Sequence, residues 1–150
     1  MRILIQECLE GKVTIDGLVH GEIGNGEVLF VGFTNDDTTS IVDKMVEKLF
    51  KLRIFKDDCD KTNWNLEKTG GNILCISQFT LFADITQGNR PSFVNAMKGE
   101  ESEKLYDYFC SKLKQRLPGC QFGVFGADMK VELINDGPFT ILMDSKELFE

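Results

Sequence analysis

Asn72–Leu81 has the sequence NILCISQFTL, in which polar residues follow an apolar run. Residues 73–76 are apolar, and Ser77, Gln78 and Thr80 come directly after them. A short apolar run of this length is typical of a β-strand. On a regular strand, Gln78 and Thr80 would share one face and Ser77 would take the other. The segment therefore predicts a strand whose end has hydrogen-bonding side chains, either for structure alone or for a site.

A second segment, Asn135–Thr140, has the sequence NDGPFT and separates two strand-like runs. These runs are Met129–Ile134 and Phe139–Met143. Gly-Pro pairs mark turns, and bonds that precede proline are the only peptide bonds that are commonly cis. The chain has only three prolines. We therefore expect Gly137-Pro138 to form a specific turn between two strands.

Three further segments predict strands on the N-terminal side. Residues 2–9 form one, and Glu27–Phe33 is almost wholly apolar, which predicts a strand buried on both faces. Lys12–His20 predicts a hairpin, because Asp16-Gly17 suits a tight turn with positive φ. Strands therefore dominate the first part of the chain.

Two segments predict helices that cover these strands. Apolar residues recur at helical spacing over Ile41–Phe50, after a cluster of capping residues. A second helix is expected over about Glu100–Leu117, where a Pro-Gly pair stops it. Pro91 suits the first turn of a short third helix. The sequence therefore predicts a mixed α/β fold in one domain, residues 1–150, built from layers of sheet and helix.

Composition limits the class of protein. The chain has 150 residues, of which 42% are hydrophobic and 27% charged, so one globular domain is expected. No segment approaches the roughly 18 apolar residues of a membrane span. The apolar start of the chain is too short for a signal peptide. We therefore expect a cytoplasmic protein with no membrane partner.

The cysteines and the single histidine argue against a metal centre. The five cysteines form no C-x-x-C pair, and their odd number gives no simple disulfide framework. His20 is the only histidine. Metal ligation therefore lacks both spacing and partners, and we expect free, mostly buried thiols with no metal and no other cofactor.

The formal net charge of −7 argues against broad, non-specific binding to phosphate backbones, and we expect no DNA partner. A local basic patch is compatible with this charge. Lys44, Lys48 and Lys51 would lie on the polar face of the first predicted helix, with Arg53 and Lys56 nearby. These residues form either a solvated helix face or, for an RNA substrate, its basic contact surface.

Conventional hydrolytic chemistry is hard to build from this sequence. A Ser-His-Asp triad needs a base that orients and accepts a proton. His20 follows a predicted hairpin turn and is expected to be a solvated surface residue. No G-x-S-x-G elbow, P-loop or dinucleotide fingerprint occurs. An enzyme built on this chain would use an unusual base or take part of its chemistry from the substrate.

Together these segments resemble the D-aminoacyl-tRNA deacylases, homodimeric enzymes that free tRNA wrongly charged with D-amino acids. Ser77–Leu81 and Asn135–Thr140 match the two signature motifs of that family. The resemblance spans nearly the whole chain and implies three layers, β/β/α. Other matching segments are the start of the chain to Gln6, the Gly-rich hairpin 21–26, Arg90–Phe93, Phe125–Met129 and Asp144-Ser145.

The resemblance implies a pocket for the terminal adenosine of tRNA and its ester, with Ser77, Gln78 and Thr80 as the catalytic segment. In the family, side chains contribute little direct chemistry, and the terminal ribose 2′-hydroxyl helps to activate the attack. A threonine without a base is a poor nucleophile at neutral pH, so we expect Thr80 to position the substrate. The implied substrate-binding residues are Phe79, Phe125, Ala127, Met129, Asn135, Gly137, Pro138 and Thr140, of which Phe125 and Met129 would contact the adenine.

The resemblance also implies how L-amino acids are rejected. Gly137-Pro138 would have a cis bond and would reach into the active site of the partner subunit. Its two carbonyl oxygens would meet the α-amino group of the substrate. An L side chain would then collide with the backbone, whereas a D side chain or the hydrogen of glycine would not. The expected reaction is hydrolysis of D-aminoacyl-tRNA, and of mischarged glycyl-tRNA.

One residue departs from the family pattern. Glu7 follows Gln6 where the family usually has an arginine that helps to hold the Gly-Pro element. Because this reverses the charge, a related deacylase that removes a mischarged L-amino acid from tRNA is one alternative. A non-enzymatic tRNA-binding module is the other, although the presence of both motifs argues against it.

Overall fold

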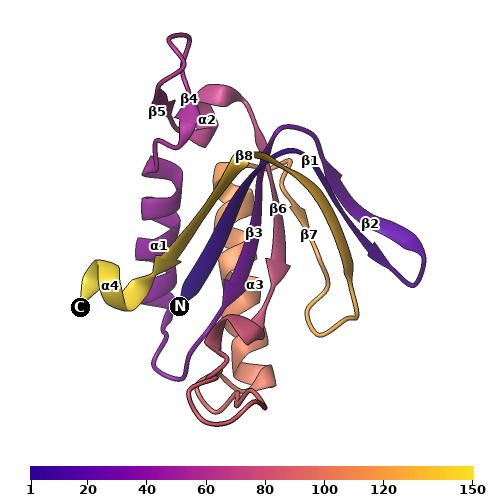
Figure 1. The fold of residues 1–150 in the computed structure, drawn as a ribbon, viewed down its shortest axis with the longest axis vertical. Coiled ribbons are helices and arrows are strands. Elements are labelled where there is room, and N and C mark those ends of the chain that lie inside the picture. The colour runs from indigo at the N-terminus through magenta and orange to yellow at the C-terminus, as the bar shows by residue number, and fades with distance from the viewer.

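The computed structural model describes all residues from 1 to 150. It contains a strongly curved mixed sheet with two long helices on one face (Figure 1). None of the helices combines the length and apolar character needed to cross a membrane. The elements are β1 (Arg2–Ile15), β2 (Leu18–Ile23), β3 (Gly26–Gly32), α1 (Thr39–Lys51), β4 (Phe55–Lys56), β5 (Thr62–Trp64), α2 (Leu66–Thr69), β6 (Asn72–Ser77), the 3-10 helix η1 (Phe79–Phe82), α3 (Gly99–Arg116), β7 (Gln121–Phe122), β8 (Lys130–Asp144) and α4 (Ser145–Phe149).

Strand β1 organises the six-stranded sheet. Its first half pairs antiparallel with β3 and its second half with β2, while β8 follows its other edge. The predicted turn between β1 and β2 is confirmed, because Asp16 and Gly17 have φ values of 50° and 78°. A side chain at Gly11, where β1 changes partner, would lie 2.9 Å from Val28 of β3. Gly11 therefore lets the two halves of the sheet approach each other.

Two hydrophobic cores lie on the two faces of the curved sheet. The larger has 22 buried residues and fills the space between the sheet and the helices, with Leu29, Val46 and Phe109 among them. The smaller is enclosed by strands and consists of Cys8, Val13, Ile23, Val28, Leu74 and Ile76. Two cores separate three layers, so the mixed α/β fold with β/β/α layers is confirmed.

The two long helices form where hydrophobic periodicity predicts them. The Thr38 side chain accepts a hydrogen bond from the backbone N–H of Ile41 and caps α1. Helix α3 packs beside α1, and Lys112 and Arg116 of α3 form ion pairs with Asp43 and Glu47 of α1, at 3.2 and 2.9 Å. These contacts hold the last turns of α3 against α1.

Two expected strands are in fact one. From Lys130 onward, the segments Met129–Ile134 and Phe139–Met143 belong to the single strand β8, and the predicted turn lies inside it. The pairing of β8 with β1 shifts register between Gln6 and Cys8. Because β1 continues straight past the interruption, β8 bulges and then resumes its pairing instead of ending.

Two other local expectations were wrong. The strand ends at Ser77, and Phe79–Phe82 forms a 3-10 helix, so Gln78 and Thr80 do not continue a regular strand. Pro91 does not start a helix either, because the backbones of Asp84 and Ser92 pair through hydrogen bonds of 2.7 and 2.9 Å. That pairing closes a long loop instead.

Glu27 on β3 places a carboxyl group inside the protein. Only 2% of the residue is exposed, and its Oε1 has no hydrogen-bond partner. Glu7 lies directly opposite on β1. Burial, and to a smaller extent the charge of Glu7, raises the pKa of Glu27 to about 8. Glu27 is therefore mainly protonated at neutral pH.

This burial predicts that stability falls as the pH rises. The folded-state pKa of about 8 lies above the ordinary value of 4.5, so the folded protein binds more protons than the unfolded chain between these values. Glu27→Gln mimics the neutral carboxyl. We expect its melting temperature to exceed that of the wild type by several degrees at pH 8.5, and by less at pH 5. Thermal unfolding at both pH values measures the difference.

Glu22→Gln, at an exposed position on β2, is the matched control and should leave the melting temperature unchanged. A gap between Glu27→Gln and the wild type that is equal at pH 5 and pH 8.5 would show that Glu27 is ionised in the folded protein throughout.

Candidate active site

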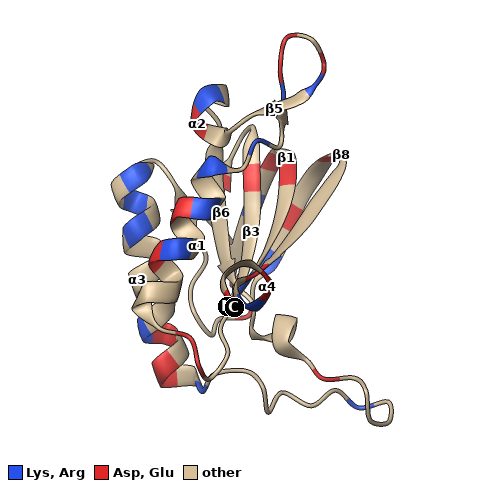
Figure 2. Cartoon of the chain, turned by 90° about the vertical axis from the view of Figure 1, so that its left-hand side faces the viewer, with Lys and Arg blue, Asp and Glu red and all other residues tan.

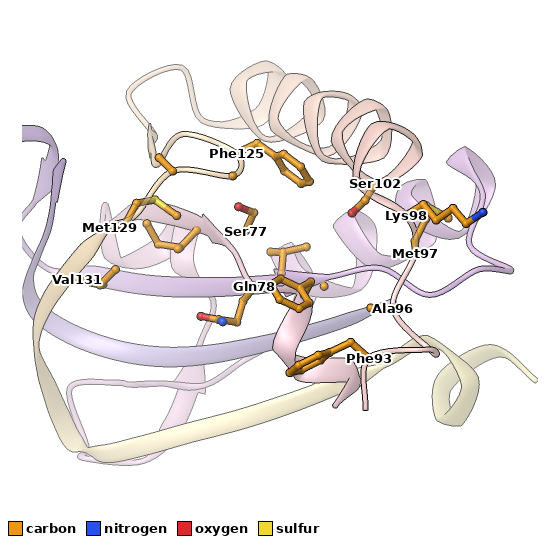
Figure 3. A pocket seen from close by; sticks show the side chains of 17 residues that line it. Ser77, Gln78, Phe93, Ala96, Met97, Lys98, Ser102, Phe125, Met129 and Val131 are labelled. Atoms are coloured by element: carbon orange, nitrogen blue, oxygen red, sulfur yellow. The ribbon is translucent and has the colours of Figure 1, made fainter. Parts of the chain in front are cut away.

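A cavity of about 600 Å³ opens where β3 and β6 end. Its walls come from these strands, η1, the start of α3 and the loop before β8 (Figure 3). Ten of the 17 lining residues are hydrophobic, and the volume is that of a typical small-ligand site. The lining residues are Val31, Gly32, Ile76, Ser77, Gln78, Phe79, Phe93, Ala96, Met97, Lys98, Gly99, Ser102, Phe125, Gly126, Ala127, Met129 and Val131.

The segment after β6 forms the floor of this cavity. The backbone N–H of Gln78 donates to Val31 O at 2.7 Å, which extends the parallel pairing of β6 with β3 by one residue. A side chain at Gly32 would lie 2.7 Å from Gln78 O, so glycine is needed for this close approach. Ser77, Gln78 and Phe79 all line the cavity.

Thr80 lies beside the cavity and not in its lining. It is exposed on η1, and its hydroxyl accepts a hydrogen bond from the Gln78 amide. The side chains of Gln78 and Thr80 are neighbours, as a shared strand face would also have made them. It is the 3-10 helix, however, that brings them into contact. This arrangement suits a group that holds Gln78 in place.

An aromatic wall faces Ser77 across the cavity. Phe125, Ala127 and Met129, which the family resemblance implies as substrate-binding residues, all line the cavity. The Phe125 ring packs against Tyr106 of α3, with centroids 5.8 Å apart. The Tyr106 hydroxyl donates to Cys75 O on β6 at 3.1 Å. The strand, the helix and the aromatic wall are therefore held in fixed positions relative to one another.

Phe93, from the family-matching segment Arg90–Phe93, packs edge-on against Phe79 at the mouth, with ring centroids 5.0 Å apart. Other lining residues gave no signal in the sequence. Lys98, Gly99 and Ser102 belong to the start of α3 and match no chemical motif. They join the cavity only because α3 packs against the sheet, so tertiary contacts would have been needed to find them.

The turn Gly137-Pro138 is not part of this cavity. Its peptide bond is cis, as the family resemblance implied, and both residues are exposed. Gly137 instead borders a second cavity of about 410 Å³. The two signature segments are therefore not brought together within one chain.

Side chains hold the turn rigidly. The Asn135 Oδ1 accepts from the backbone N–H of Phe139 at 2.7 Å, and its Nδ2 donates to Thr140 Oγ1 at 3.0 Å. The Gln6 amide also donates to Thr140 Oγ1, at 3.3 Å. Asn135 and Thr140, both expected to contact substrate, therefore brace the Gly-Pro backbone in this chain.

Comparison with known proteins identifies the family. The family described as D-Tyr-tRNA(Tyr) deacylase matches residues 4–144. The chain belongs to this family. A D-aminoacyl-tRNA deacylase of Listeria innocua is 45% identical over 148 residues, which cover 99% of each chain. A D-aminoacyl-tRNA deacylase of Clostridium tetani is 44% identical over 149 residues, which cover 99% of this chain and 100% of the relative.

Solved structures have the same fold. One, described as a c-Myc DNA unwinding element binding protein, is 35% identical, with a TM-score of 0.91 over 96% of this chain and 98% of its own. Another, described as a probable eukaryotic D-amino acid tRNA deacylase, has a TM-score of 0.83 over 95% of this chain and 97% of its own. At 18% identity the second shows the fold alone.

Glu7, the residue after Gln6, borders the second cavity together with Asp136 and Lys56. Burial, followed by the charge of Asp136, raises the pKa of Glu7, and the charge of Lys56 opposes this shift. Lys56 also forms an ion pair with Asp60, at 3.0 Å. The Gly-Pro turn is thus held by Asn135 and Gln6, and the acidic side chains of Glu7 and Asp136 lie beside it.

The basic residues of α1 are placed as expected but are not all unpaired. Lys44 lies over the ring of Phe149, at 5.7 Å from its centroid, and Lys51 forms an ion pair with Glu47 at 3.7 Å. Figure 2 marks Lys and Arg positions along α1 and on the last turns of α3 in blue. A tRNA contact at this surface stays a prediction.

Proposed function

We propose that this deacylase-family chain hydrolyses the ester between a D-amino acid and the 3′ end of tRNA, releasing both. The observation that carries the proposal is the cavity in which Ser77–Phe79 faces Phe125 and Met129. Its apolar walls suit a stacked base, and its polar floor suits the ester. Because aminoacyl-tRNA is used in translation, we place the reaction in the cytoplasm.

The cavity supplies donors but no side-chain base. The 17 lining residues include no histidine, aspartate, glutamate or cysteine, and Lys98 is the only ionisable one. His20 is exposed on β2, as expected. The first hydrogen bond of η1 runs from Leu81 N to Gln78 O, at 3.3 Å. The backbone N–H of Phe79, a residue that lines the cavity, precedes it and is free to stabilise an oxyanion.

The attacking water therefore needs activation from the substrate. The terminal ribose of tRNA has a 2′-hydroxyl next to the ester. In the proposed reaction the 2′-hydroxyl accepts a proton from the water while it passes its own proton to the 3′-oxygen. The water oxygen bonds to the ester carbon, and the 3′-oxygen leaves as a hydroxyl. Holding an activated ester and water in this geometry can supply much of the rate enhancement.

This mechanism predicts which groups are dispensable. Ser77→Ala and Thr80→Ala should each keep measurable activity, because neither hydroxyl is an obligatory nucleophile. Replacing the terminal 2′-hydroxyl of the tRNA by hydrogen should be far more damaging. Single-turnover rates of deacylation measure both effects. An acyl-enzyme trapped on Ser77 or Thr80 and seen by mass spectrometry would contradict the mechanism.

We also propose that each site is completed by Gly137-Pro138 of a second copy. The turn is exposed and braced, yet it lies outside the cavity of its own chain. The mouth of the cavity is apolar, with Phe79 54% and Phe93 39% exposed. Strand β8 pairs only with β1, which leaves its outer edge open on both sides of the turn. Such an edge is usually covered.

The substrate preference follows from this shared site. Backbone at Gly137-Pro138 would meet the α-amino group and leave no room for an L side chain, whereas D-amino acids and glycine would fit. The L-selective deacylase is the second candidate function. Glu7 supports it, because this residue places a negative charge beside the Gly-Pro turn, where the resemblance implies a positive one. A binding module without activity is the third.

Deacylation rates on three substrates separate these candidates. We expect D-Tyr-tRNA and Gly-tRNA to be hydrolysed and L-Ala-tRNA to be spared, because only the L side chain would collide with the turn. Faster hydrolysis of L-Ala-tRNA than of D-Tyr-tRNA would establish the L-selective alternative. Binding of all three without hydrolysis would establish the module.

A further inference from the structure

Ser102 is a buried polar residue with its side chain at the cavity. It lies in the first turn of α3 and is only 5% exposed. Its backbone N–H donates to Lys98 O at 2.9 Å, but its hydroxyl has no hydrogen-bond partner in the protein. Figure 3 shows the hydroxyl pointing into the cavity. The only side-chain oxygen that is both sealed from solvent and without a partner is Glu27 Oε1. The Ser102 hydroxyl therefore remains accessible from the cavity, where it can bind a ligand atom.

The neighbours of Ser102 indicate which part of a ligand it would meet. Tyr106 lies four residues later on the same face of α3, and its ring packs against Phe125. Ser102 therefore lies beside the Phe125 ring, across the cavity from Ser77 (Figure 3). A base stacked on Phe125 would turn one edge toward the Ser102 hydroxyl.

We propose that Ser102 hydrogen-bonds an edge atom of the terminal adenine and so positions the substrate of the proposed deacylase reaction. The inference rests on that proposed function. Stacking on Phe125 tolerates any base, whereas a hydroxyl adds a directional contact, donating to a ring nitrogen or accepting from the exocyclic amine. Ser102 thus contributes preference for adenine, and it fixes the base so that the ester reaches the floor at Ser77.

The charges around α3 favour a base over a phosphate as the partner. A helix start with no side-chain cap would attract an anion, and α3 lacks such a cap. Lys98 at the helix start would add to this attraction. However, the first turn also carries Glu100 and Glu101, whose two negative charges outweigh that of Lys98 and oppose a phosphate. A neutral base edge meets no such repulsion.

Ser102→Ala tests the contact on D-Tyr-tRNA. One lost hydrogen bond corresponds to roughly a five- to tenfold fall in kcat/KM. Ser111→Ala is the matched control, because Ser111 is exposed on the same helix and its hydroxyl donates only to Tyr108 O, at 2.7 Å. It should leave kcat/KM unchanged. Ser102→Cys, which keeps the size but donates weakly, should fall between the two.

Single-atom analogues of the terminal adenosine locate the contact. We would compare tRNAs ending in purine riboside or in 1-deaza-, 3-deaza- or 7-deazaadenosine. With one of these analogues, kcat/KM of the wild type should fall by the same factor as the Ser102→Ala substitution causes. The same analogue should lower kcat/KM of Ser102→Ala no further. A Ser102→Ala rate equal to that of the wild type, or a loss that multiplies with every analogue, would overturn the inference.

Binding of a non-hydrolysable amide analogue, 3′-D-tyrosylamino-adenosine, separates failure of this inference from failure of the proposed function. If the wild type does not hydrolyse D-Tyr-tRNA, the proposed function fails, and weaker analogue binding by Ser102→Ala would still support the contact. If the wild type is active, and Ser102→Ala binds the analogue and hydrolyses D-Tyr-tRNA as well as the wild type, the proposed function holds and only the Ser102 contact is refuted.

Discussion

The parallel pairing of β3 with β6 is the constraint on which the site depends. It places Ser77 at the open end of the sheet, and the bond from Gln78 N to Val31 O fixes the next residue at 2.7 Å. Gly32 permits this contact because any side chain there would meet Gln78 O. The chain then turns into η1 with its first N–H groups free. The rigid end of β6 therefore presents backbone hydrogen-bond donors at the floor of the cavity.

The rest of the fold serves to enclose that floor. Helix α3 packs on the sheet through the larger core, and Tyr106 connects it both to β6 and to Phe125. The resulting cavity has apolar walls and no acid or base among its lining side chains except Lys98. Its chemistry is therefore that of orientation and backbone hydrogen bonding, with the substrate supplying its own hydroxyl.

The elements of the fold that depend on local sequence could be predicted. The amphipathic pattern located α1 and α3, and Asp16-Gly17 located the hairpin, because periodicity and turn chemistry are short-range. The pocket residues Ser77 and Phe125 were found through motif resemblance. The continuity of β8 and the place of Ser102 were not predicted, because both depend on which elements pack together. Glu27 looked like part of an apolar strand, and only the fold shows that its carboxyl is buried.

A site divided between two chains is the central claim, and mixing two inactive variants tests it most directly. Ala127→Trp would fill the cavity, and Gly137→Val would add a side chain to the exposed turn. Each homodimer should be inactive. A refolded equal mixture should recover roughly a quarter of wild-type activity, since half of the dimers would combine one intact cavity with one intact turn. A mixture as inactive as its parts would contradict the shared site.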